Sequence, residues 1–510
     1  MTIAVELRLE QCVRQHARRM PQAIAVLTPD RPISWSELDR AADVLAANLC
    51  AQGLVPGDRI GWLGRNRPEY PILVVAARRA RLAIVGLNWR LSKEELDYVT
   101  HDARPKLVIA DDEFRAAVPQ SFSIVSSDAL PGASATLAAW MADPPAQVAI
   151  DSGAPLGSDP VLLLYTSGTT GRPKGILYSL DGVEQMLRAP NPLEFQSTSL
   201  PLIVPPVFHI AGGTWTQFAL VIGMQQILLS HGTPDAMLDA IERWKVTHSL
   251  FVPTLVQMAV DAQQRKPRDV SSLRMVAYGA APMPPELLRA AAAVFRNAKF
   301  TQAYGMTEAL GPVCHLPPSA HRLDAPAPVG APPTGFPDPG VGLRIVEVRG
   351  DRDLPAGECG EVLIRTPWPR PEYWSLPSGS ESAYDEAGWL HTGDIGFMDN
   401  EGCLHLVDRV GDLIITGGEN VYPAEVESVL RSIDGVADAG VFSLPDAQWG
   451  EIVCAALVPC AGATLDHVAI MELCRERLAH YKCPRRIIEL TDLPRNAAGK
   501  LLRRHLRERA

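Results

Sequence analysis

The sequence lacks the features of a membrane, secreted or metal-ribbon protein. Its longest apolar stretch, residues 218–229, contains two glutamines and falls short of the roughly 18 residues that a membrane-spanning helix needs. Glu6 and Glu10 lie where a signal peptide would be apolar. The nine cysteines are scattered, with no CxxC pair and no Cys/His pairing at the usual zinc spacing. We therefore expect a cytoplasmic protein with reduced thiols and no membrane span.

Basic charge is also scarce. The chain has 48 Lys+Arg against 58 Asp+Glu, a formal net charge of −10. Nucleic acid is therefore not an expected partner, because its phosphate backbone requires a basic surface. Hydrophobic residues make up 47% and charged residues 21%, which is typical of a globular protein. The 510 residues exceed the roughly 250–300 that one core usually holds, so at least two domains are expected.

The order of apolar patterns predicts an α/β protein with an additional α+β unit. Strands are predicted at 59–63, 107–110 and 161–166, with helices such as 36–50 and 285–296 between strands, which is typical of parallel sheets covered by helices. A Pro- and Gly-rich stretch at about 325–380 indicates a β-subdomain. We predict a large N-terminal domain, 1–408, with stacked, mostly parallel sheets, joined by a hinge to a small mobile C-terminal domain, 409–510.

The strongest local motif is a glycine-rich segment, residues 165–175, that directly follows an apolar strand. Its glycines let the backbone approach a ligand, and its hydroxyls, free N–H groups and lysine suit phosphate oxygens. Its spacing does not match the Walker phosphate loop. The candidate phosphate ligands are Thr166, Ser167, Gly168, Thr169, Thr170, Gly171 and Lys174.

Three further segments carry chemistry. Tyr304, Thr307 and Glu308 combine an aromatic ring for a base, a hydroxyl for a phosphate and a carboxylate for Mg²⁺. Asp394 and Arg409 form a plausible ribose clamp. Lys500, on a glycine loop near the C-terminus, could deliver a mobile positive charge.

Taken in order, these motifs closely resemble the adenylate-forming superfamily, in its acyl-CoA synthetase or AMP-dependent carboxylic acid ligase branch. The resemblance extends over nearly the whole chain and includes Pro56–Arg59, Tyr278–Pro282 and Thr416–Pro423. It implies activation of a carboxylic acid by Mg-ATP to an acyl-adenylate and pyrophosphate, followed by displacement of AMP by an acceptor.

The resemblance assigns roles to individual residues. It implies that residues 166–174 hold the β- and γ-phosphates, that Tyr304 packs on the adenine, and that Thr307 contacts the α-phosphate. It makes Glu308 the Mg²⁺ ligand and Lys500 the bridge between the acyl carboxylate and the α-phosphate. Residues lining the adenine would be Gly279, Ala280, Ala281 and Pro282, and those holding the ribose Asp394 and Arg409.

The residues predicted to line the acyl pocket are small or apolar, and their many Gly and Ala favour a wide pocket for a hydrophobic acid of the aromatic, cyclic or medium-chain class. His209 occupies the position where peptide-synthetase adenylation domains usually carry an Asp, so an α-amino acid substrate is not expected. We count His209 among the catalytic residues and favour a lid role over that of a core histidine. The pocket candidates are Phe208, His209, Ala211, Gly212, Gly305, Met306, Ala309, Gly311 and Cys314.

The acceptor is less defined than the nucleotide. The resemblance places CoA, the co-substrate, near Gly417, Gly418, Glu419 and Trp449, and favours an acyl-CoA ligase. The hinge position carries Gly411 instead of the usual Asp or Lys, and this supports an amine acceptor as the alternative. Luciferase-like oxygenation has no supporting residue, and a non-catalytic nucleotide module conflicts with the presence of Lys174, Glu308 and Lys500. A separate carrier protein and a homodimer stay open.

Overall fold

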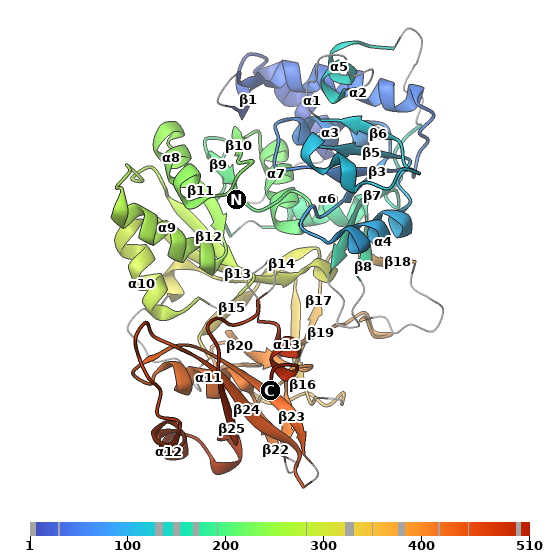
Figure 1. The fold of residues 1–510 in the computed structure, drawn as a ribbon. Helices are drawn as coiled ribbons and strands as arrows, with labels where there is room; N and C mark the ends of the chain where they lie inside the picture. The colour runs from blue at the N-terminus through green and yellow to red at the C-terminus, as the bar shows by residue number, and fades with distance from the viewer. Residues whose placement is uncertain are drawn as a thin grey trace.

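The computed structural model describes residues 7–28, 31–127, 136–145, 153–166, 173–190, 192–281, 283–321, 331–348, 350–375, 383–416, 419–446, 448–495 and 501–510. Within these residues the strands form two large sheets and one small sheet (Figure 1). The two large sheets are built by the N-terminal four-fifths of the chain, and the small one by the C-terminal part. This arrangement confirms the predicted fold class.

The first sheet joins a parallel half to an antiparallel half. From β13 outward through β12, β11, β9, β10 and β1 the pairs are parallel, and from β13 through β14, β15, β20, β19, β17 and β16 they are antiparallel. The described strands, in sheet order, are β16 (Gly342–Val346), β17 (Gly360–Arg365), β19 (Leu390–Met398), β20 (Leu404–Arg409), β15 (Pro333–Pro337), β14 (Gly311–Leu316), β13 (Lys299–Met306), β12 (Met275–Gly279), β11 (His248–Phe251), β9 (Pro201–Ile203), β10 (Gln226–Leu228), β1 (Ile24–Leu27) and β2 (Ile33–Ser34). The predicted β-subdomain is thus continuous with the parallel sheet.

The second sheet is parallel except at one edge, where β7 and β8 form a hairpin. A strand from the Pro- and Gly-rich stretch, β18, pairs with β8 and extends this sheet, which the sequence did not predict. The described order is β18 (Glu372–Trp374), β8 (Lys174–Ser179), β7 (Pro160–Thr166), β4 (Ala83–Gly86), β3 (Arg59–Leu63), β5 (Leu107–Ala110) and β6 (Ile124–Ser126).

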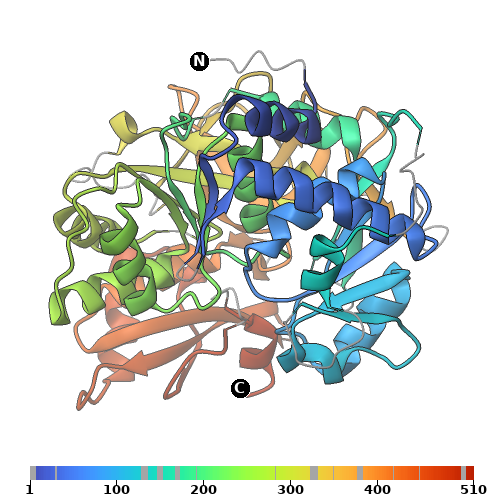
Figure 2. The same ribbon diagram turned by 90° about the horizontal axis from the view of Figure 1, so that it is seen from above.

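Helices cover both sheets and enclose the main core. Helix α2 begins at a capping box, in which the Ser34 side chain accepts from the Glu37 N–H and the Glu37 carboxylate reaches back to the Ser34 N–H. Helix α1 packs against α2, α3 and α7 at the top of the molecule (Figure 2). The helices of the N-terminal part are α1 (Leu9–Arg19), α2 (Trp35–Ala51), α3 (Glu69–Arg79), α4 (Lys93–Ala103), α5 (Leu137–Ala142), α6 (Leu180–Arg188), α7 (Ile210–Ile222), α8 (Pro234–Trp244), α9 (Pro253–Arg265) and α10 (Pro285–Val294).

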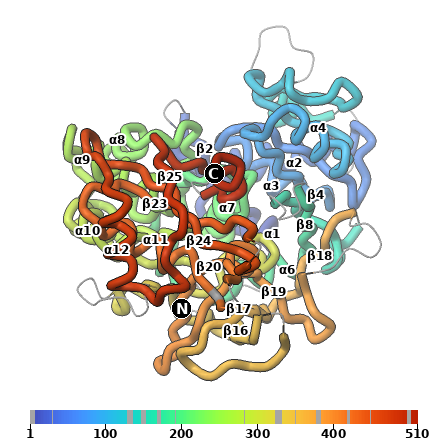
Figure 3. The backbone as a smooth tube through the Cα atoms, turned by 60° about the horizontal axis from the view of Figure 1, so that its bottom comes forward, coloured from blue at the N-terminus to red at the C-terminus, as the bar shows by residue number. Residues whose placement is uncertain are grey.

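The C-terminal part folds around its own sheet and core, seen in orange and red below the large sheets (Figure 1) and in front of them in Figure 3. Helix α13 packs on β23, and α11 contacts both β23 and β20. Its elements are β21 (Ile414–Thr416), β22 (Glu419–Val421), β23 (Val436–Asp446), β24 (Gly450–Pro459), β25 (Arg486–Glu489), α11 (Pro423–Arg431), α12 (His467–Arg477) and α13 (Arg503–Arg507). The domain boundary at 408/409 and the mobility of the small domain stay predictions.

Two expected absences can be compared with the structure. No helix in the described part of the chain is long and apolar enough to cross a bilayer. All nine cysteines are free thiols, and most of them are buried.

Candidate active site

The glycine-rich motif is the turn of the β7–β8 hairpin. Thr166 and Lys174 are register partners at the end of this hairpin that adjoins the connecting segment. Both side chains therefore lie at the base of the predicted phosphate loop. Predicted ligands that lie outside the described residues are Ser167, Gly168, Thr169, Thr170 and Gly171.

Glu308 lies beside this hairpin, on the short helical turn η2 (Thr307–Ala309) that follows β13. The Thr166 hydroxyl donates a hydrogen bond to Glu308 Oε1 at 3.5 Å. Burial raises the pKa of Glu308, opposed by hydrogen bonds from its own backbone N–H and from Thr166 and by the positive charges of Arg409 and Lys174. No basic side chain of the described residues forms a salt bridge with this carboxylate. A partly desolvated carboxylate without a direct counterion suits a hard divalent cation such as Mg²⁺.

Three aromatic side chains hold the backbone around Glu308. The Tyr178 hydroxyl donates to the Thr307 carbonyl at 2.6 Å, and the Tyr384 hydroxyl donates to the Glu308 carbonyl at 2.5 Å. The Trp368 Nε1–H donates to the carbonyl of Ala309 at 3.2 Å. These contacts fix three successive carbonyls and so orient the Glu308 side chain. Sequence reasoning missed all three donors, which come from separate segments and form no local motif.

The predicted ribose clamp is assembled from β13, β19 and β20. Asp394 and Arg409 are register partners, and Arg409 Nε lies 2.9 Å from Asp394 Oδ1. The Tyr304 hydroxyl donates to Asp394 Oδ2 at 2.7 Å. Burial, together with the adjacent Asp394 carboxylate, raises the pKa of Tyr304 well above its ordinary value. Each Asp394 oxygen keeps accepting capacity for a diol.

The predicted adenine-lining segment leaves the carboxyl end of β12 next to Tyr304. Gly279 pairs with Ala303, and a Cβ at Gly279 would lie 2.3 Å from the Ala303 carbonyl oxygen. Ala280 adopts a left-handed conformation with φ of 66° and is exposed. This strained turn redirects the chain across the ends of the parallel strands, where α/β proteins bind ligands. Ala281 is half-buried, and Pro282 lies outside the described residues.

His209 lies in an aromatic cluster at the start of α7. Its ring centroid is 4.5 Å from that of Phe208, and Phe208 meets Trp89 edge-on at 6.1 Å. The side chain of His209 is solvent-accessible, yet the surrounding protein and the nearby Arg90 lower its pKa to about 4. The lid role of His209 stays a prediction. The ring is neutral at pH 7.

Two glycines of the predicted acyl pocket are explained by close backbone packing. A Cβ at Gly212 would lie 2.4 Å from the Pro205 carbonyl oxygen, and one at Gly305 would lie 2.0 Å from that of Gly311. These glycines are therefore required for close backbone approach and are not by themselves evidence of a wide pocket. Ala309 and Cys314 are buried members of the main core, whereas Ala211 and Met306 are half-buried.

Comparison with known families agrees with this geometry. Residues 13–374 match the AMP-binding enzyme family, and residues 425–500 match the AMP-binding enzyme C-terminal domain. The chain belongs to the AMP-binding enzyme family. This membership confirms the predicted adenylate-forming superfamily.

Relatives of similar length support the same assignment. The chain is 33% identical to a fatty acid–[acyl-carrier-protein] ligase of Streptomyces coeruleorubidus, over 98% of this chain and 96% of the relative. It is 35% identical to a feruloyl-CoA synthase of an Amycolatopsis species, over 97% of each chain.

Two solved structures share the fold. One is o-succinylbenzoate CoA synthetase from Bacillus subtilis in complex with its acyl-adenylate intermediate, with a TM-score of 0.83, 30% identity and 97% coverage of each chain. The other is an amide bond synthetase from Marinactinospora thermotolerans, with a TM-score of 0.85, 28% identity and coverage of 98% of this chain and 99% of that one.

In this AMP-binding enzyme the junction between the two parts contains several charges that the sequence did not single out. Asp408 accepts hydrogen bonds from the backbone N–H of Arg409 at 2.8 Å and from that of Ala424, at the start of α11, at 2.9 Å. Burial raises the pKa of Asp408 to about 6, opposed by Arg503. Asp412 forms a 3.0 Å ion pair with Arg503. Carboxylates therefore lie three residues before Gly411 and one residue after it.

The remaining predicted residues lie in the C-terminal part. Gly411 is exposed, and no atom of the part of the chain that the structure describes lies within 4 Å of a Cβ built on it. Trp449 is half-buried, with the Arg485 guanidinium 4.3 Å from its ring centroid, and Glu419 is exposed. Gly417, Gly418 and Lys500 lie outside the described residues, although Arg495 and Leu501 pair across the loop that carries Lys500.

Proposed function

We propose that this protein is an AMP-forming acid–CoA ligase acting on a hydrophobic carboxylic acid. In the first step a carboxylate oxygen attacks the α-phosphorus of ATP and pyrophosphate leaves. In the second step the CoA thiol gives up its proton, attacks the acyl carbonyl carbon and releases AMP. The observation that carries this proposal is the convergence of Glu308, Thr166 and the Tyr304–Asp394–Arg409 clamp at one edge of the sheets, in a chain of this family.

The nucleotide is positioned by groups that already occupy fixed places. Asp394 accepts hydrogen bonds from the ribose hydroxyls, and its position is held by Tyr304 and Arg409. Lys174 faces the phosphates from the hairpin opposite Thr166. Because these groups are fixed before ATP arrives, little further ordering is required at the reaction step.

Glu308 would hold Mg²⁺, which neutralises phosphate charge when bound. Its carboxylate is desolvated and hydrogen-bonded by Thr166, and the Tyr384 hydroxyl fixes its backbone. Lys500 is assigned to the acyl carboxylate and α-phosphate, where negative charge rearranges during adenylation. We predict that Lys500→Ala slows adenylate formation strongly and leaves consumption of added acyl-adenylate largely intact, measured by pyrophosphate release and single-turnover thioester formation. An unchanged adenylation rate contradicts this assignment.

The acid is expected to lie against Phe208 and His209. A neutral imidazole and an aromatic cluster favour an uncharged apolar body over a substrate ammonium group. Ligases named for a fatty acid and for ferulate among the relatives support this class. The cellular location, the oligomeric state and the identity of the acid stay predictions.

An acid–amine ligase is the second candidate. The uncharged Gly411 and the similarity to an amide bond synthetase support it. Both candidates share the adenylate, so only the second step separates them.

The test is a product analysis with Mg-ATP and a panel of aromatic, cyclic and linear acids. AMP and acyl products are measured by mass spectrometry with CoA or with simple amines. Rapid acyl-CoA formation from one acid class supports the CoA ligase, whereas slow thioester and ready amide formation favours the second candidate. Glu308→Gln serves as the matched control. Formation of AMP from Mg-ATP and the acid at the wild-type rate in this variant contradicts the proposed site.

A further inference from the structure

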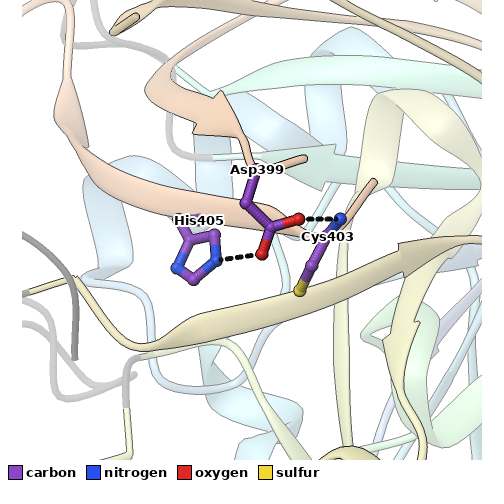
Figure 4. Close-up of side chains that lie close together, drawn as sticks. All are labelled: Asp399, Cys403 and His405. Carbon is purple, nitrogen blue, oxygen red and sulfur yellow. Dashed lines mark hydrogen bonds and ion pairs between the residues drawn. The ribbon is translucent and has the colours of Figure 1, made fainter. Parts of the chain in front are cut away.

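A second group of reactive side chains lies outside the nucleotide site. Asp399 and Cys403 lie in the turn between β19 and β20, and His405 is the second residue of β20 (Figure 4). One ligand atom from each residue lies within 4.8 Å of the other two. His405 and Cys403 are each only 4% exposed, so two of these atoms are withdrawn from water.

The hydrogen bonds of His405 define what its Nε2 atom faces. Nδ1 lies 3.2 Å from the Ala331 carbonyl oxygen, which can only accept, so Nδ1 carries a proton. In a neutral ring Nε2 then has a lone pair, and this lone pair faces Asp399 Oδ2 at 3.1 Å. Two acceptors at that distance require either a proton or a cation between them.

The surroundings of His405 and Asp399 resemble those of metal ligands, whereas the Cys403 thiol donates to the Leu404 carbonyl at 3.6 Å. Metal-binding histidines typically donate their second ring N–H to a backbone carbonyl or carboxylate, as His405 does to Ala331. The other carboxylate oxygen of Asp399 accepts from the backbone N–H groups of Glu401 and Cys403, each at 2.9 Å, which holds the carboxylate in place. The ring of His405 is also fixed by stacking on Phe397 at 4.7 Å.

The three ligand atoms lie close enough to reach a tetrahedral ion after a small shift. Ligands at the usual zinc distances lie about 3.3–3.8 Å from one another, so one atom needs to move by about 1 to 1.5 Å at most. A thiolate and an imidazole favour zinc or another late divalent transition metal over Mg²⁺ or Ca²⁺.

We propose that Asp399, Cys403 and His405 form a zinc-class metal site that is separate from the Mg-ATP site. The Cys403 thiol releases its proton to solvent on binding, and a water molecule completes the four ligands. The ion ties the β19–β20 turn to Ala331, next to β15. The same hairpin carries Asp394 and Arg409 at its opposite end, five residues from Asp399 along the chain and roughly 16 Å away at 3.3 Å per residue.

The proposal is tested by metal binding to the full-length protein after chelation and dialysis, without ATP or CoA. Titration with Zn²⁺ is expected to give one tight site, and titration with Co²⁺ the thiolate-to-cobalt absorption of a cysteine ligand. Cys403→Ser and Asp399→Asn are expected to weaken zinc binding at least tenfold. Cys460→Ser, which removes an exposed thiol, is the matched control and should bind as the wild type does.

Two readouts keep the test independent of variant folding. In the wild-type protein, Zn²⁺ should raise the melting temperature and protect Cys403 from alkylation, identified by peptide mass spectrometry, while excess Mg²⁺ should do neither. Absence of a tight zinc site in the wild type, or wild-type binding by both variants, overturns the proposal. Either result leaves the proposed ligase activity untouched, because no step of that activity depends on this site.

Discussion

The nucleotide-binding edge and the junction with the C-terminal part are held together in different ways. At the edge, functional side chains have partners from distant segments, such as Tyr304 with Asp394 and Thr166 with Glu308. At the junction, a short chain segment is held by the acceptor Asp408, by the Asp412–Arg503 ion pair and by the Val410 N–H to the Gly393 carbonyl. Within the described residues, a Cβ built on Gly411 would meet no atom within 4 Å.

The side chains at the nucleotide-binding edge are thus preorganised, whereas the junction is held by fewer contacts. Substitution at the edge removes a fixed side-chain contact at the proposed nucleotide site and leaves its former partners unpaired. Substitution at the junction changes a balance of few charges, so its effects should be smaller and should depend on pH.

The largest effect is expected at the edge, for Asp394→Asn. The variant loses charge-assisted hydrogen bonds to the ribose and weakens the hold on Arg409 and Tyr304. A hydrogen bond to a charged group contributes roughly 1.5–3 kcal/mol, and about 1.4 kcal/mol is a tenfold change in rate. We therefore expect kcat/KM for ATP to fall about 10- to 100-fold, measured by pyrophosphate release. Asp269→Asn, at an exposed ion pair with Lys245, is the control. An equal fall in kcat/KM for ATP in this control would contradict the role proposed for Asp394.

An intermediate effect is expected at the aromatic cluster, for His209→Ala. KM for the acid should rise about tenfold or the preferred acid should change, while KM for ATP should stay near the wild-type value, because the ring lies beside Phe208 and not at the ribose clamp. The pKa of His209 is about 4, so its neutral form dominates above pH 5. If the wild-type acid KM shows a transition between pH 6 and 7 that His209→Ala abolishes, the neutral-ring assignment is wrong.

A smaller, pH-dependent effect is expected at the junction, for Asp408→Asn. The folded-state pKa of Asp408 is raised to about 6, so the folded protein binds more protons than the unfolded chain between that pH and the ordinary carboxyl range. Ionised Asp408 therefore lowers the free energy of unfolding as pH rises from about 4 to 6. Denaturant unfolding at both ends of this window should show a smaller loss for the variant than for the wild type. Identical slopes would mean that Asp408 does not carry this pH dependence.

The smallest effect on stability is expected for Gly411→Asp and Gly411→Lys. No atom lies within 4 Å of the new Cβ, so the free energy of unfolding should change by less than about 0.5 kcal/mol, as at ordinary surface sites. The ratio of thioester to amide product should nevertheless shift if the hinge charge affects the second step. Equal ratios in all three proteins would show that Gly411 does not determine the acceptor.

Several site features were predictable because they are local. The β7–β8 hairpin follows from an apolar strand ending in a glycine-rich turn, and Glu308 follows directly from its place after β13. Other features depend on contacts that no local pattern encodes. Tyr178, Trp368 and Tyr384 converge on residues 307–309 from three separate segments. The sequence also gave no indication that Asp408 caps α11.

The metal-site proposal shows the same limit of sequence spacing. Cys403 and His405 are separated by one residue, which is not a usual zinc pattern. Asp399 directly follows the last residue of β19, on the other side of the turn. The turn brings them together because antiparallel strands return the chain to its starting point.

The sequence by itself determined the alternation of strands and helices, the family, and the residue types available for phosphate, ribose and Mg²⁺. Hydrophobic periodicity and motif order are properties of neighbouring residues, so they can be read without a fold. Only the tertiary structure decided that Tyr304 holds Asp394 across 90 residues, that Gly212 and Gly305 serve close packing, and that Asp399, Cys403 and His405 meet. Such contacts depend on how distant elements pack, because burial and pairing are set by the whole assembled core.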